Sequence, residues 1–172
     1  MRSNVFIIRD FDKNASITEL MREQNIPFEN RILEQNVVEA NYYISKKLNV
    51  PLGTKLFCLK RLRIVDHAPR SIETVYIPLS EMQDIQNMDF NSCSLYTAIH
   101  EKKGIRTLRH REDILIAEAN EEERNLLQLE PEETEIQLIK GISLKSDNQV
   151  FEYFEISSVP EFYRYRSISY LL

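Results

Sequence analysis

The chain has 172 residues, of which 42% are hydrophobic and 28% charged, values ordinary for one globular domain. Its net charge of −5 argues against direct binding of nucleic acid, because neutralising phosphates requires a clustered basic surface. No run approaches the roughly 18 apolar residues of a membrane helix, and no secretory signal opens the chain. We therefore expect a cytoplasmic protein without a membrane-spanning segment.

Few residues offer metal or covalent chemistry. Cys58 and Cys93 are too few for a disulfide framework and match no zinc-binding spacing. The three histidines share no motif with a serine or cysteine nucleophile, and a chain with three glycines has no glycine-rich phosphate loop. We expect no metal, no cofactor and no catalytic residue.

The first part of the chain predicts an arm, a helix, a strand and a second helix. Residues 1–13 show little periodicity and are expected to form an arm or linker end before a single domain over residues 14–172. Ser16 with Glu19 forms a capping box that predicts a helix to about residue 24. A strand over residues 30–38 and a helix over 39–48 are expected next, followed by a turn.

The remainder of the chain is dominated by strands. Residues 55–65 are apolar on both faces, which is typical of a strand covered on both sides. Residues 70–78 are expected to pair back on this strand, and a helix over 92–103 should end at Gly104. Further strands are expected over 107–117, 151–157 and 163–171. Because the strands adjoin one another, we predict an α+β fold, a mainly antiparallel sheet with flanking helices on one face.

Two stretches of the chain resemble each other. Residues 40–60 and residues 119–140 each begin with Ala-Asn, continue as a short helix, turn at a proline and enter a strand. Each is followed by a strand with one glutamate, Glu73 in the first unit and Glu152 in the second. The duplication predicts an internal pseudo-twofold repeat, with a site where the two halves meet.

Arg61 and Arg63 form the sharpest local signal. Since side chains alternate along a strand, both guanidinium groups lie on one face of an apolar strand. A buried charge without a partner is very costly, so each arginine needs a carboxylate or a bound anion. The residues leave three interpretations open: anion binding, internal pairs with Glu73 and Glu152, or an exposed edge.

Three further features have a functional and a structural interpretation. Ser94 and Tyr96 lie at the start of a helix, and a helix N-terminus can bind an anion. In the structural interpretation, Ser94 is only the N-cap of that helix and Tyr96 is a core residue. Glu73 and Glu152 are candidates for acid–base work, for ligand hydrogen bonds or for neutralising the arginines. A basic cluster comprises Arg106, Arg109, His110 and Arg111. Two acidic residues follow it directly, so a solvated face is favoured over phosphate binding there.

Taken together, these segments resemble the UTRA domain, the effector-binding module of HutC-type GntR transcriptional regulators. The resemblance covers about residues 14–170, and its motifs are Ser16-Ile17-Thr18, Val50-Pro51-Leu52-Gly53-Thr54, residues 59–66, residues 72–78, Ser94-Leu95-Tyr96, residues 117–129 and Phe151-Glu152-Tyr153. The chain departs from the family in two places. Ile17 stands where many members have phenylalanine, and residues 158–163 replace the usual closing Tyr-Arg-Gly-Asp-Arg-Tyr segment.

The resemblance implies a chorismate-lyase-like α+β fold, a homodimer, and a small anionic effector, often a sugar phosphate. It also implies which residues bind the effector, with Arg61, Arg63 and the Ser-Leu-Tyr helix start holding the anionic group; the effector-binding residues are Ser16, Ile17, Arg61, Arg63, Glu73, Ser94, Tyr96 and Glu152.

Family members carry an N-terminal winged helix–turn–helix domain, and nothing in this chain resembles it. We therefore expect the sensor half of a regulator, which controls operator DNA only through that absent domain. Two alternatives are a chorismate-lyase-like enzyme and a stand-alone small-molecule binding protein.

Overall fold

A computed structural model describes residues 5–11, 15–105 and 109–169. Its main feature is a six-stranded antiparallel sheet with the strand order β2-β3-β4-β7-β6-β5. These strands are β2 (Phe28–Glu39), β3 (Lys55–Val65), β4 (Ala68–Pro78), β5 (Arg109–Glu118), β6 (Glu135–Leu144) and β7 (Val150–Ser158). A separate two-stranded parallel sheet joins β1 (Ile7–Asp10) to β8 (Tyr163–Arg166).

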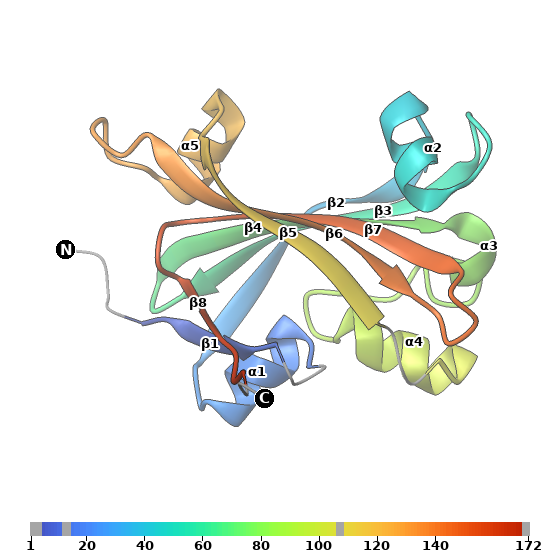
Figure 1. Cartoon of the computed structure of the whole chain (residues 1–172), viewed down its shortest axis with the longest axis horizontal. Helices are drawn as coiled ribbons and strands as arrows, with labels where there is room; N and C mark the ends of the chain where they lie inside the picture. The colour runs from blue at the N-terminus through green and yellow to red at the C-terminus, as the bar shows by residue number, and fades with distance from the viewer. Residues whose placement is uncertain (1–4, 12–14, 106–108, 170–172) are drawn as a thin grey trace.

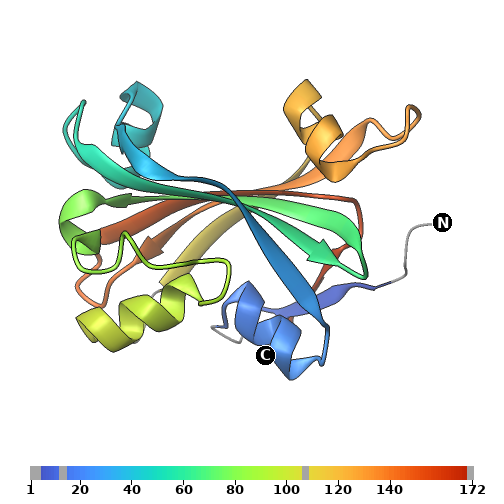
Figure 2. The same ribbon diagram turned by 180° about the vertical axis from the view of Figure 1, so that it is seen from behind.

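The helices lie on both faces of the six-stranded sheet (Figures 1 and 2). On one face stand α2 (Tyr42–Leu48) and α5 (Glu121–Leu127), and on the other lie α1 (Ile17–Glu23) and α4 (Leu95–Lys103), while the short α3 (Leu79–Met82) follows β4. The expectation of helices on one face is therefore wrong. The physical reason is visible in β3, which is apolar on both faces and so needs cover on both.

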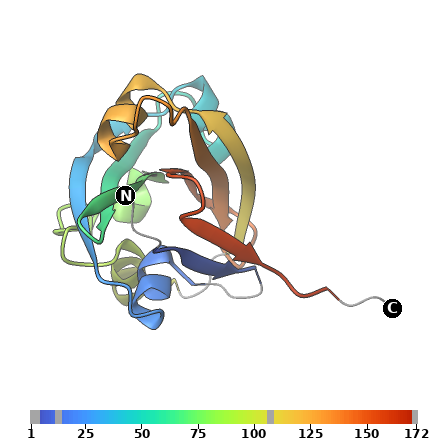
Figure 3. The same ribbon diagram turned by 90° about the vertical axis from the view of Figure 1, so that its left-hand side faces the viewer.

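The sheet is curved, and its concave side faces β1, β8 and α1 (Figure 3). Most of the hydrophobic core fills this side, with Phe57, Leu59 and Phe154 among its buried residues. A smaller cluster packs under α2, where Ile44, Leu48 and Tyr153 are buried. The concave side is therefore the place where sheet, helices and the terminal strands meet.

Capping residues set the helix starts. Ser16 forms the expected capping box, in which its hydroxyl accepts from the Glu19 amide at 3.2 Å and its own amide donates to the Glu19 carboxylate at 2.8 Å. The helix expected from residue 39 starts at Tyr42, because Glu39 still pairs in the sheet and Asn41 is the N-cap. Similarly α4 starts after its N-cap Ser94 and, as expected, ends at Gly104 with a φ of 67°.

The chain ends differ from expectation. Residues 1–13 are expected to form an arm or linker end, whereas Ile7–Asp10 form β1 and Ile7 is fully buried. The strand expected over 163–171 stops at Arg166, because its partner β1 ends at Asp10. Residues 107 and 108 and residues 170 and 171, also expected in strands, lie outside the described residues. None of the helices in the described part of the chain has the length and apolar character needed to cross a membrane.

The two similar stretches fold with similar local geometry. α2 and α5 both have an asparagine N-cap, and both end in a residue with positive φ, Asn49 and Gln128. The residue before each N-cap donates its amide to a threonine carbonyl, Ala40 to Thr54 at 2.9 Å and Ala119 to Thr134 at 2.8 Å. A pseudo-twofold relation between the complete halves stays a prediction.

Candidate functional site

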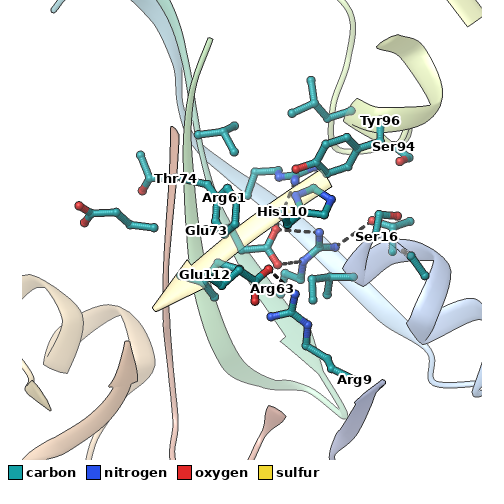
Figure 4. A pocket seen from close by; sticks show the side chains of 18 residues that line it. Arg9, Ser16, Arg61, Arg63, Glu73, Thr74, Ser94, Tyr96, His110 and Glu112 are labelled. Carbon is teal, nitrogen blue, oxygen red and sulfur yellow. Dashed lines mark hydrogen bonds and ion pairs between the residues drawn. The ribbon is translucent and has the colours of Figure 1, made fainter. Parts of the chain in front are cut away.

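A cavity lies under the concave face of the sheet, between β3, β4 and β7 on one side and α1, α4 and β1 on the other (Figure 4). Its free volume is about 60 Å³, which suits a small charged group, since one water needs roughly 10–15 Å³ on this scale. Seven of the eight predicted residues line it: Ser16, Ile17, Arg61, Arg63, Glu73, Ser94 and Tyr96. The structure thus brings together residues from β3, β4, α1 and the start of α4.

Arg63 is held in place by protein groups. Its Nη2 donates to Glu73 Oε2 at 2.7 Å and its Nε donates to the other oxygen of the same carboxylate, a two-point contact. The remaining nitrogen, Nη1, donates to Asn30 at 3.1 Å and to Thr18 at 3.3 Å. With 2% of its surface exposed, Arg63 forms the internal pair that the sequence analysis left open.

Glu73 is the carboxylate shared by both arginines. It lies opposite Arg61 in the β3–β4 register, and besides Arg63 it accepts from Arg61 Nη2 at 3.2 Å. Burial raises the pKa of the Glu73 carboxyl, but the two guanidinium groups outweigh burial and hold that pKa below its usual value. Glu73 is therefore an ionised partner for the arginines and a weak candidate for a general base.

Arg61 differs from Arg63 in how its donors are used. It is 4% exposed and makes the one contact to Glu73, while its Nε and Nη1 are buried without a partner among the described protein atoms. Burial and the neighbouring Arg63 lower the pKa of the guanidinium, which nevertheless stays charged because arginine is so strongly basic. Arg61 is therefore the cation of this site whose N–H donors remain available to hydrogen-bond a ligand.

The start of α4 forms another wall of the cavity. Ser94 is the N-cap, but its hydroxyl accepts from the Thr97 amide at a long 3.4 Å. Tyr96 extends over Arg61 and donates its phenol hydroxyl to Glu152 Oε1. Glu152, the eighth predicted residue, does not line the cavity because it lies behind Tyr96; it also accepts from Ser143 Oγ at 2.5 Å.

Three polar residues of the cavity wall, Arg9, His110 and Glu112, are not among those expected from the sequence. Arg9, on β1, donates to Glu112 on β5 at 2.7 Å and to the Tyr165 hydroxyl at 3.2 Å. His110 and Glu112 are two positions apart on β5, and that spacing could have placed them on one face of the strand.

The basic cluster around His110 was interpreted as a solvated face. Arg109 and Arg111 are indeed exposed, on the alternate positions of β5, and Arg106 lies outside the described residues. His110 is exposed as well, but unlike them it contacts the cavity wall, because its Nδ1 lies 2.7 Å from Ser143 Oγ and its ring stands edge-on to Tyr96 and Phe154.

Among the described residues that line the cavity, the ion pairs leave one positive charge without a carboxylate of its own. Arg63 and Arg61 share the single carboxylate Glu73, and Arg9 is paired with Glu112. A small anion with two or three oxygens, placed between Arg61 and the N-terminus of α4, would meet unused N–H donors from both. The arrangement therefore favours binding of an anion over acid–base chemistry.

The UTRA domain model matches residues 12–164 of this chain. Among solved structures, PhnF from Mycobacterium smegmatis superposes with a TM-score of 0.84 at 19% identity, covering 97% of this chain and 73% of that chain. The effector domain of the same protein gives a TM-score of 0.82 at 20% identity, covering 91% and 95%.

A third similar structure is the ligand-binding domain of a putative GntR-family transcriptional regulator from Bordetella bronchiseptica. It superposes with a TM-score of 0.74 at 21% identity, covering 84% of this chain and 90% of that chain. These structures share the fold of this chain, which confirms the predicted α+β class with its large antiparallel sheet.

Proposed function

Because this chain belongs to the UTRA domain family, we propose that it is the ligand-sensing domain of a bacterial GntR-family transcriptional regulator. In this proposal a small anionic effector, such as a sugar phosphate, binds in the cavity around Arg61. Binding controls the affinity for operator DNA of a winged helix–turn–helix domain that is separate from the domain described above. Assignment to the HutC type within the GntR family is part of the same proposal.

One observation carries the proposal, the two unpartnered donors of Arg61. A buried N–H without an acceptor costs about 1–3 kcal/mol, and more on a charged group. The fold supplies a carboxylate that pairs with Arg63 at two points, and no described protein atom accepts a hydrogen bond from Arg61 Nε or Nη1. Oxygen atoms of a bound anion would remove this cost, and the positive end of the nine-residue helix α4 would add to the attraction.

The eight residues predicted for effector binding then have different roles. Arg61 and the start of α4, with Ser94, contact the anion, while Ser16, Ile17 and Tyr96 shape the cavity around it. Arg63 is a positioning residue, because its donors are used by Glu73, Thr18 and Asn30. Glu73 fixes the two arginines, and Glu152 acts through the hydroxyl of Tyr96.

Regulation is proposed to act through a cytoplasmic homodimer. If the effector favours one arrangement of the two subunits, it changes the spacing of the two DNA-binding domains attached to them. Coupling free energies of this kind are typically about 1–3 kcal/mol, enough for a 5- to 150-fold change in affinity.

Thermal unfolding in buffer free of phosphate and sulfate tests the proposal, with a panel of sugar phosphates and carboxylic acids added singly. An effector at about a hundred times its Kd should stabilise the protein by about 2.7 kcal/mol, or roughly 5–10 °C for this size. We expect Arg61→Gln to fold and to lose this shift. The matched control Arg109→Gln, an exposed arginine on β5, should keep it.

The outcome that contradicts the proposal is a protein that no anion stabilises and in which Arg61→Gln behaves like wild type. Chorismate belongs in the same panel, because its consumption with release of an aromatic acid would instead establish the lyase alternative.

A further inference from the structure

Glu152 on β7 is a fully buried acid that the proposed anion contacts leave unused. Its surface is 0% exposed, and its Oε1 accepts two hydroxyl hydrogen bonds, from Tyr96 and from Ser143. Its other oxygen, Oε2, is buried and has no partner among the described residues. Within the same described part of the chain, no lysine or arginine forms an ion pair with it. A permanently ionised carboxylate would be expensive in this position.

Hydrogen bonds connect this acid to the outside of the protein. Ser143 Oγ, which donates to Glu152, also lies 2.7 Å from His110 Nδ1. His110 is exposed in part at the mouth of the cavity, and its ring stands edge-on to Tyr96, with the ring centroids 6.3 Å apart. A proton therefore has a continuous hydrogen-bonded route between solvent and the buried carboxyl.

The charge of Glu152 decides the charge of the whole site. Each described acid on the cavity wall has a basic partner: Glu112 pairs with Arg9, Glu155 with Lys140 at 3.5 Å, and Glu73 with Arg63. Arg61 has only a share of Glu73. If Glu152 is ionised, it balances Arg61 and the site is neutral, whereas a protonated Glu152 leaves one positive charge at Arg61.

We propose that the site binds its anion together with one proton, which is taken up from solvent and held by Glu152. An anion on Arg61 cancels the positive potential that favours an ionised Glu152 and adds a negative charge nearby, so the carboxyl binds a proton. This inference rests on the proposed function, and it adds that effector affinity falls as pH rises.

The surrounding groups support this assignment of the proton. The described groups that act on Glu152 directly are Tyr96 from α4 and Ser143 from β6, which donate to it, and Arg61 from β3, through its charge. His110 from β5 contacts Ser143, and Glu73 from β4 acts on Tyr96, so both lie one contact further away. Burial raises the pKa of Glu152, and it outweighs the hydrogen bonds and the charge of Arg61, which lower it. Burial also lowers the pKa of His110, which favours a neutral ring at neutral pH.

Calorimetric titration with inorganic sulfate, an anion that does not titrate near neutral pH, tests this on the whole chain. Repeating the titration in buffers with different ionisation enthalpies counts the protons taken up. We expect an uptake approaching one proton per sulfate and a Kd that rises by up to about tenfold per pH unit above the pKa of the anion-free site. Glu152→Gln should bind sulfate with no uptake and no pH dependence.

Ser143→Ala provides a second variant, because losing one donor to the carboxylate should move the same pH dependence to higher pH. Sulfate binding that needs Arg61 but takes up no proton in the wild type overturns the inference and leaves the proposed function standing. The inference is also overturned if proton uptake persists in Glu152→Gln and is lost in His110→Gln, because His110 then carries the proton. If sulfate binds at no pH and Arg61→Gln behaves like the wild type, the proposed function and this inference both fail.

Discussion

Two arginines with the same chemistry and nearly the same burial, Arg61 and Arg63, differ in the hydrogen-bond partners that the fold gives them. Arg63 has an acceptor for each of its three nitrogens, and Arg61 has one acceptor in all among the described residues. Burial alone therefore does not single out Arg61, the arginine for which we propose anion binding. The distribution of acceptors around each guanidinium group does, because an unused buried donor is what a ligand can satisfy.

Glu73 should be the most sensitive single residue of the site. Glu73→Gln removes the carboxylate between two buried guanidinium groups, and we expect it to destabilise the protein by about 3–5 kcal/mol. Urea unfolding at neutral pH measures this, with the exposed Glu135→Gln as control. A loss below about 1 kcal/mol would mean that solvent or another group replaces the carboxylate.

The pH dependence of unfolding gives an independent check on Glu73. Because the pKa of this acid is lower in the folded than in the unfolded protein, its stabilising effect is complete above the unfolded pKa. It is lost as pH falls through the folded pKa. The wild type should therefore lose stability more steeply than Glu73→Gln below about pH 4.3, the ordinary glutamate value.

At the scale of elements, the sheet is shaped by close contacts between neighbouring strands as much as by alternation of side chains. Gly141 on β6 lies opposite Phe154 on β7, and the aromatic ring covers the position where a side chain would be. A Cβ at Gly141 would lie 2.4 Å from Phe154 Cζ and 2.8 Å from the Arg111 carbonyl oxygen. The missing side chain is what allows Phe154 to reach the cavity wall beside His110.

Gly141→Ala should therefore destabilise the fold by about 1–3 kcal/mol through overpacking. Because Phe154 lines the cavity, we also expect weaker anion binding in the same variant. Chemical denaturation and sulfate titration measure the two effects, and Glu135→Ala, at the exposed start of the same strand, should change stability by less than about 0.5 kcal/mol. Unchanged stability would show that Phe154 moves aside without cost.

At the scale of the whole molecule, the terminal strands close the concave side of the sheet. β1 and β8 pair with each other and belong to a different sheet from the strands that they cover. The ion pair between Arg9 and Glu112 joins β1 to β5 across 103 positions of the chain. The side chain of Arg9 therefore connects β1, which precedes α1, to β5 on the opposite side of the cavity.

Arg9→Ala should loosen this closure without unfolding the main sheet. Hydrogen exchange followed by mass spectrometry should show faster exchange in residues 7–10 and 163–166, while the amides of β3 and β4 stay protected. Glu112→Gln should give the same pattern in weaker form. Equal acceleration in the central strands would mean that the ion pair supports global stability instead.

Features that depend on near neighbours in the chain could be predicted without the structure. The capping box at Ser16, the glycine end of α4 and the strand with two apolar faces follow from local geometry, and the structure confirms them. The succession of adjoining strands was enough to predict the α+β fold class. Motifs shared with the UTRA family indicated eight residues, of which all but Glu152 surround one cavity, although their part in binding stays a prediction.

The tertiary structure alone decided which charges are paired. Sequence spacing placed Arg61 and Arg63 on one face, but the acceptors of Arg63 include Thr18 from a position 45 residues away. Arg9 reaches Glu112 over 103 positions, and Glu152 lies behind Tyr96 from 56 positions away. Helices and strands form from contacts within a few residues, whereas the free energy of a buried charge depends on every group that folding brings around it.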